Sequence, residues 1–300
     1  MTRTWTLARA LVVILLPAGL LAASLQAQSD KITLPRRPAP NQSFSVKMTQ
    51  DVDMAMTVEG EGAPTTGGPM KTSGQISVTM DQKIGAVDAT GLLPVEVTYT
   101  DAGGEMTVNG QAMKLSQMRD QVVGKSLKLQ LDAAGGVSKA DVPEGLEMSE
   151  QMLRQMWESF AGRIPATPLA VGEKFTMPLS IPMPIPVAGE QGTKLEGTVT
   201  TTLAKVEGTG ANRLAYLDQV FEGGLNTAVK RTADSPEVKV NMKMSGTGRV
   251  TVDLARGVMP SGDTTFKING EVTGPSPTGG SIVMKMDGTM HMVQAEEKKP

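Results

Sequence analysis

Apolar and polar residues alternate along the stretch Phe44-Ser-Val-Lys-Met-Thr-Gln-Asp-Val-Asp-Met-Ala-Met-Thr-Val58. Every even position carries Phe, Val or Met except Gln50, and every odd position is polar or charged except Ala55. A period of two over this length is typical of a β-strand with one buried face and one face in water. The stretch therefore predicts a long strand that begins at about residue 43.

The same alternation returns along most of the chain. A turn is predicted at Asn109-Gly110, because Asn-Gly tolerates the positive φ angles of a type I′ hairpin. Glycines at Gly246 and Gly248 interrupt the longest later stretch and favour a bend or bulge. Further strands are predicted at residues 76–86, 93–99, 127–131, 195–206, 214–221, 238–254, 264–273 and 281–294.

One segment has a helical pattern instead. Ser149 can cap it, and the apolar residues that follow fall on a single stripe. We expect this stripe to pack on the sheet; its members are Met152, Leu153, Met156, Trp157 and Phe160. Four of them, Met152, Met156, Trp157 and Phe160, are the candidate lining of a cavity. The predicted fold is mainly β: a strongly curved antiparallel sheet, half-barrel or barrel-like, with one amphipathic helix packed on it.

The N-terminus has the features of a secretory signal peptide. Arg3 and Arg9 precede an apolar run at residues 10–23, and small residues follow up to Ala27. The run is about 14 residues long, whereas a membrane span needs about 20, and Pro17 interrupts it. We expect cleavage after residue 27 and a mature protein in the periplasm or outside the cell that does not span the membrane.

Composition limits the remaining possibilities. The chain has no cysteine, so it has neither disulfides nor a lipid-acceptor thiol after the signal peptide. The net charge is -2 with both signs interspersed, which argues against nucleic-acid binding. Aromatic residues make up 3%, too few for the aromatic girdles of an outer-membrane barrel.

The predicted organisation is a signal peptide at 1–27, a Pro-rich tether at 28–42, one β-rich domain at 43–295 and a charged tail at 296–300.

Methionine is abundant, with 21 residues in the chain. Four methionines and the only histidine fall within residues 284–292, and thioether with imidazole ligands suits Cu(I). The alternative is that methionine replaces Leu or Val as core filler. If the strand is continuous, Met284 and Met286 face away from His291; a hairpin at Asp287-Gly288 would bring the three together. We expect the continuous strand.

No pattern of catalytic residues is present. A single histidine cannot be matched to a nucleophile and an acid at a recognisable spacing, and no metal-protease, hydrolase or phosphate-loop motif occurs. The expected protein is not an enzyme and has no cofactor.

Three stretches resemble recurring segments of an uncharacterised family of exported bacterial β-rich proteins. They are Leu93-Pro-Val-Glu-Val-Thr-Tyr99, Gly124-Lys-Ser-Leu-Lys-Leu with the following Gly135-Gly-Val, and Pro168-Leu-Ala-Val-Gly-Glu-Lys-Phe175. The resemblance covers residues 43–225. The resemblance implies that many members are lipoproteins, and this chain departs from them by lacking the lipid-acceptor cysteine. The resemblance implies a fold similar in character to the curved-sheet carriers of lipids, and no activity.

Two functions from different classes follow. The first is a non-enzymatic envelope protein whose curved sheet binds a hydrophobic small molecule, a lipid or a partner segment, because one helix cannot cover so much apolar strand surface. Its alternative is a sheet whose interior is simply packed core. The second function is periplasmic Cu(I) binding through Met284, Met286 and His291.

Overall fold

The computed structural model describes most of the chain after the predicted signal peptide. The described residues are 31–60, 69–114, 116–144, 150, 153, 154, 157, 164–182, 194–230, 236–275 and 281–297.

Long strands dominate the described residues, and the only helical elements with assigned bounds are one α-helix and one 3-10 turn. The first half contains β1 (Gln42–Gly60), β2 (Met70–Ile84), β3 (Leu93–Val108), β4 (Gln111–Lys114), α2 (Ser116–Val122), β5 (Ser126–Leu131) and β6 (Val137–Asp141). The second half contains β7 (Lys174–Pro182), β8 (Lys194–Glu207), the 3-10 turn at Gly210–Asn212, β9 (Leu214–Val229), β10 (Val238–Asp253), β11 (Val258–Pro275) and β12 (Ser281–Glu297).

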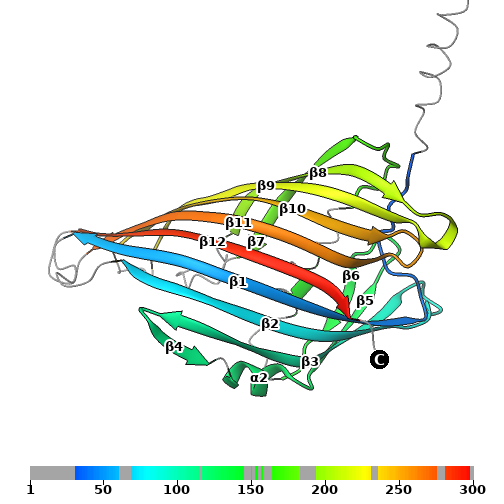
Figure 1. The fold of residues 1–300 in the computed structure, drawn as a ribbon, viewed down its shortest axis with the longest axis horizontal. Helices are drawn as coiled ribbons and strands as arrows, with labels where there is room; N and C mark the ends of the chain where they lie inside the picture. Colours follow the sequence, from blue (N-terminus) through cyan, green and yellow to red (C-terminus); the bar gives the residue numbers. More distant parts are fainter. Residues whose placement is uncertain are drawn as a thin grey trace, which may run out of the picture.

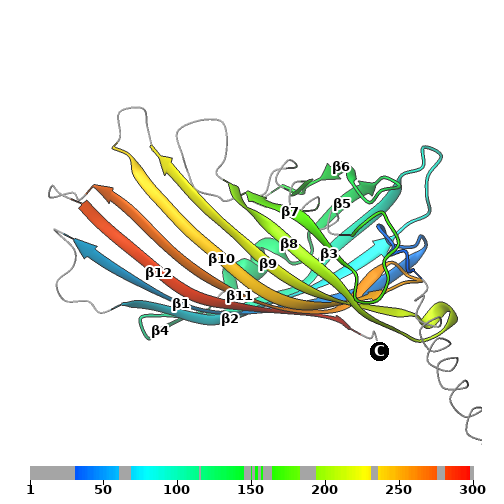
Figure 2. The same ribbon diagram turned by 90° about the horizontal axis from the view of Figure 1, so that it is seen from above.

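These strands form one antiparallel sheet of 12 strands that is not closed. The order is β6-β5-β3-β2-β1-β12-β11-β10-β9-β8-β7, with β4 paired to β3. The first and last long strands of the chain, β1 and β12, are therefore neighbours near the middle (Figure 1). The two ends of the path, β5–β6 and β7, lie on the same side of these central strands in both views (Figures 1 and 2). A mainly β fold is thus confirmed, and β7, which carries Pro178, is an end strand as its prolines require.

The register places the alternating residues on two distinct faces. Val52 of β1 pairs with Met290 of β12 and with Gly74 of β2, whereas the adjacent Asp51 pairs with His291 and Gln75. Successive side chains of a strand point to opposite sides, so this register puts the apolar residues of neighbouring strands on one side of the sheet. We call the side that carries the even-numbered residues of β1 and β12, with the residues in register with them, the apolar face.

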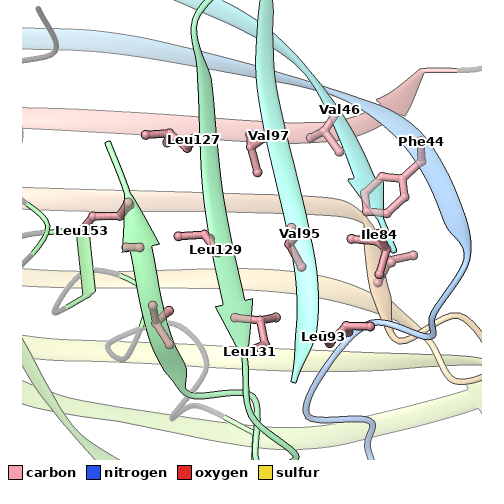
Figure 3. Close-up of a cluster of buried hydrophobic side chains, with 13 residues drawn as sticks. Phe44, Val46, Ile84, Leu93, Val95, Val97, Leu127, Leu129, Leu131 and Leu153 are labelled. Atoms are coloured by element: carbon pink, nitrogen blue, oxygen red, sulfur yellow. The ribbon is translucent and has the colours of Figure 1, made fainter. Parts of the chain in front are cut away.

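Buried side chains on the apolar face form three clusters. The first joins β1, β2, β3, β5 and β6 and includes Phe44, Leu93 and Leu131 (Figure 3). The second joins β8, β9 and β10 around Leu203 and Leu217. The third, around Phe221 and Phe266, joins β7 to β11, and Met290 and Met292 of β12 pack against it.

The segment predicted as a Pro-rich tether contributes to this core. Leu34 has only 1% of its surface exposed, and Ile32 is also buried. The backbone of Ile32 forms a two-way hydrogen-bonded bridge with Leu169, and both residues belong to the second cluster. Ile32 and Leu34 therefore pack with the domain, because their apolar side chains lie in the core beside β8 and β9. The prolines that suggested a tether lie at positions 35, 38 and 40, after these residues.

The predicted amphipathic helix is described only at four residues. Glu150, Leu153, Arg154 and Trp157 have helical backbone. Leu153 is buried in the first cluster (Figure 3), and Trp157 is half-buried against it. The Trp157 indole donates a hydrogen bond to the carbonyl of Gly135 at 3.0 Å. The complete amphipathic helix and the strong curvature of the sheet both stay predictions.

Two further predictions from the sequence concern the turn at Asn109-Gly110 and the charged tail at residues 296–300. Asn109 and Gly110 have φ angles of 50° and 80° between paired Val108 and Gln111, as expected for the type I′ hairpin. The predicted charged tail begins inside β12, which ends at Glu297. Glu296 accepts two hydrogen bonds from Arg256, at 2.8 and 3.0 Å, so this end of β12 is tied to the start of β11.

Candidate functional site

The apolar face is almost free of charge over six neighbouring strands. Among the described residues of β2, β1, β12, β11, β10 and β9 that lie on it, Glu296 is the one charged side chain, and Arg256 neutralises it. The opposite face of the same strands carries charges of both signs. A face this long without charge is suited to contact with an apolar molecule.

Methionines form a row across this face. Met70 of β2, Met56 of β1 and Met286 of β12 are direct neighbours in register. Met286 is in turn paired with Gly270 of β11, which is paired with Met242 of β10. Four strands thus supply thioethers to one line, which we call the methionine row. Unbranched thioether side chains adapt to ligands of different shape.

Gly270 of β11 leaves space for the methionine side chains of the two neighbouring strands. A Cβ atom at Gly270 would stand 3.1 Å from Cγ of Met242 and 3.5 Å from Cε of Met286. The two methionine side chains therefore lean toward each other above the glycine. Glycine at this position leaves the room that the flexible side chains fill.

Burial falls from the clusters toward the end of the sheet where β1 ends and β12 begins. Met244, in the third cluster, has 9% of its surface exposed. Met56, Met242 and Met286 are half-buried, while Met70 and Met284 reach 37% and 36%. This end of the apolar face is therefore open to contact, whereas the opposite end is packed core. The packed-core alternative thus holds for the end of the face that carries the clusters, and a ligand surface at the open end stays a prediction.

The structure separates the histidine from the methionines. β12 runs without a break through Asp287-Gly288, as the parity argument predicted. His291 lies on the polar face, where its Nε2 is 2.9 Å from a carboxylate oxygen of Asp263 and its Nδ1 is 3.7 Å from Asp51. Met284, Met286 and His291 are consequently not brought together. Within the described part of the chain, no group of three or more His, Cys, Asp or Glu residues is placed to hold a metal ion.

Of the four predicted cavity-lining residues, only Trp157 lies among the described residues. Trp157 packs against the first cluster, and its hydrogen bond to Gly135 fixes it beside the turn before β6. Met152, Met156 and Phe160 lie outside the described residues, so their role stays a prediction. The candidate site supported by the described residues is the open end of the apolar face.

Ion pairs cover the polar face of the same strands. Arg249 donates two hydrogen bonds to Asp218, at 2.6 and 3.1 Å, and this contact lowers the pKa of the Asp218 carboxyl. The hydrogen bond from Lys285 to Glu59, at 2.7 Å, raises the pKa of Lys285. These charges remain solvated, as expected for a face in water.

A surface pocket of about 630 Å³ lies over β2, β3, β5 and β6. Its lining includes a register row of alternating charge, Lys83, Glu96, Lys128 and Asp141. Alternating charges at cross-strand positions stabilise a sheet surface, and they do not favour an apolar ligand. We therefore place the candidate site on the apolar face and not in this pocket.

The methionine row could not be predicted from the sequence. Parity alone assigned Met56, Met242 and Met286 to the inner face, but the row depends on which strands are neighbours and in which register. One signal was available: Met pairs two residues apart recur at 54/56, 242/244 and 284/286. That recurrence indicates that several strands carry methionine pairs on the buried face. It does not indicate that these methionines are aligned from strand to strand.

Comparisons with known proteins add little to this site. No protein-family model and no curated protein matches the chain. A structure titled for lipid–protein interactions in lipovitellin matches with a TM-score of 0.44 and 9% identity over 87% of this chain, which spans only 26% of that protein. OpdQ and OccK11 (OpdR) of Pseudomonas aeruginosa match with TM-scores of 0.16 and 0.14, 8% identity, 85% and 88% of this chain, and 97% and 99% of their own. Likenesses this low carry no argument about fold or function.

Proposed function

We propose that this chain is an exported, non-enzymatic envelope protein that binds an uncharged hydrophobic molecule on the open end of the apolar face. One observation carries the proposal: six neighbouring strands present an apolar face with a single, neutralised charge, and its methionines are half-exposed at one end. Water contact with this surface is unfavourable, at roughly 25 cal/mol per Å² of apolar area. A bound apolar molecule would remove that cost.

Export and curvature belong to the same proposal. The signal-peptide pattern at residues 1–27 supports a mature protein in the periplasm or outside the cell. A strongly curved sheet, with the apolar face on its concave side and the predicted helix against it, would surround a ligand on more than one side. The resemblance to exported β-rich proteins is consistent with both expectations.

The function is tested first on protein purified from the envelope fraction without detergent. Native mass spectrometry should show a bound small molecule, and the uncharged dye N-phenylnaphthylamine should saturate near one per protein. Bare protein without saturable dye binding would overturn the proposal.

A pair of variants locates the site. Met284→Lys places a charge on the open end of the apolar face, whereas Thr289→Lys places the same charge on the polar face of the same strand. We expect dye affinity to fall about tenfold, or about 1.4 kcal/mol, in the first variant and to stay unchanged in the second. Equal affinities in both would exclude this face as the site.

A further inference from the structure

The methionines of this protein lie mainly outside the fully buried core. Among the described residues, the buried hydrophobic side chains are Leu, Val, Ile, Ala and Phe, and Met244 is the only methionine. Methionine that served only to fill core gaps would occupy such buried positions more often. Three members of the methionine row, Met56, Met286 and Met242, are instead half-buried, so solvent reaches them. Their positions point to a role of the thioether groups besides filling the core.

The thioether groups of these three residues come from nearby strands and approach one another. Met56 of β1 and Met286 of β12 are directly paired, and the Cβ atoms of such pairs lie about 4.5–5.5 Å apart. Cε of Met286 and Cγ of Met242 both lie within 3.5 Å of the point where a Cβ of Gly270 would stand. Each of these two carbons is bonded directly to its sulfur atom. Rotations of the unbranched side chains can therefore bring the sulfurs together above β12 and β11.

The chemistry of these donor atoms selects a soft metal ion. Thioether sulfur suits Cu(I), whereas Mg²⁺ and Ca²⁺ require oxygen ligands and Zn²⁺ prefers thiolate, imidazole or carboxylate. Asp287 and His291 of β12 lie on the polar face, on the other side of the sheet from Met286. Neither residue can therefore join the sulfurs on one metal ion. The row thus presents sulfur ligands without the nearest carboxylate and imidazole.

We propose that the sulfur atoms of Met56, Met286 and Met242 bind one Cu(I) ion above β12 and β11. The inference goes beyond the proposed function, because its ligand is a metal ion. It also differs from the cluster of Met284, Met286 and His291 considered from the sequence, which the continuous β12 separates. Thiol ligands are oxidised to disulfides outside the cytoplasm, whereas thioethers cannot form disulfides, so a sulfur site without cysteine fits the predicted export.

Copper binding is tested on the full mature protein without oxygen, with ascorbate present to keep the metal as Cu(I). Competition with the chelator bicinchoninate measures the affinity, and we expect one bound ion per protein. X-ray absorption at the copper edge should show sulfur in the first coordination shell and no nitrogen. Failure of the unmodified protein to take Cu(I) from the chelator, or a first shell of nitrogen or oxygen in place of sulfur, would overturn the proposal.

Paired substitutions assign the ion to the methionine row. Met242→Leu with Met286→Leu removes two sulfur atoms and nearly conserves side-chain volume, so Cu(I) binding should be lost while the fold is kept. Met48→Leu with Met80→Leu is the matched control, because these methionines lie on the same face and pack against the first cluster. The control should bind Cu(I) as the unmodified protein does. A cooperative unfolding transition in both double variants shows that they are folded.

Two further measurements keep this proposal separate from the alternatives. His291→Ala should leave the Cu(I) affinity unchanged, because the imidazole lies on the polar face. Met56→Leu alone should weaken Cu(I) binding, because it removes one of the three sulfurs. Cu(I) binding that survives Met242→Leu with Met286→Leu, or that is lost in His291→Ala, would overturn the thioether site. The proposed function fails separately, through absence of dye binding, because leucine keeps the apolar face and the double variant should still bind the dye.

Discussion

At the scale of single residues, Thr200 and Thr201 of β8 show that a threonine hydroxyl is paired on one face of the sheet and unpaired on the other. Thr200 points to the polar face, where its hydroxyl lies 3.0 Å from that of Thr176 in β7. Thr201 points to the apolar face, where its buried hydroxyl has no partner among the described residues. A buried, unpaired hydroxyl costs about 1–3 kcal/mol. The hydroxyl of Thr201 therefore destabilises the folded protein, whereas the hydroxyl of Thr200 does not.

Thr201→Val should raise the free energy of unfolding of the ligand-free protein by about 1 kcal/mol, because it replaces the unpaired hydroxyl by a methyl group of similar size. Thr200→Val should lower it by about 0.5–1 kcal/mol, because it removes a hydrogen bond. Denaturant titration of both variants measures the two effects. A loss of stability in Thr201→Val would show that its hydroxyl is paired after all.

The Asp218–Arg249 pair predicts a weak pH dependence. Its hydrogen bonds lower the folded-state pKa of Asp218, so the pair stabilises the protein above the unfolded pKa of about 4 and loses this effect as the pH falls through the folded pKa. Both side chains are exposed, so the expected cost of Asp218→Asn is only about 0.5 kcal/mol at pH 7. Unfolding titrations at pH 7 and pH 3 should show this difference shrinking at the lower pH, and a constant difference would contradict the prediction.

At the scale of strands, glycines decide where the side chains of neighbouring strands can lie. A Cβ at Gly288 of β12 would stand 2.6 Å from Cγ of Met54 and 2.9 Å from the carbonyl of Asp53. A Cβ at Gly262 of β11 would meet nothing nearer than 3.8 Å. Both glycines lie on the apolar face, yet only the first is required by close approach of the next strand.

Gly288→Ala should therefore destabilise the protein by about 1–3 kcal/mol, since a backbone atom cannot move aside as a side chain can. Gly262→Ala should change stability by no more than about 0.5 kcal/mol. Thermal or denaturant unfolding of the two variants provides the comparison. Equal effects would show that the β1–β12 contact is looser than the structure indicates.

At the scale of the whole molecule, the sheet is held together by pairing between distant parts of the chain. β1 and β12 are joined along 16 register pairs, from Ser45 with Glu297 to Gly60 with Ile282. The domain can therefore fold only after its last strand is available.

The mature protein should be found outside the cytoplasm, with an N-terminus near Gln28. Intact-mass measurement of the envelope fraction tests this. The expected mass lacks residues 1–27, and a species that retains them would contradict the signal-peptide prediction. Cleavage there would leave Ile32 and Leu34, which belong to the core, on the mature chain.

The sequence by itself determined the strand periodicity, the inward face of each strand and the hairpin at Asn109-Gly110, because these depend on neighbours within a few residues. It also favoured a continuous strand, with the methionines and His291 of residues 284–292 on opposite faces, over a hairpin at Asp287-Gly288, and the pairing of β12 confirms the strand. Only the tertiary structure decided that Met70, Met56, Met286 and Met242 share a line, and that Thr201, Gln219 and Thr264 share another. The physical reason is that a strand's alternation fixes a side chain's face, whereas its position along that face is fixed by pairing with strands far away in the sequence.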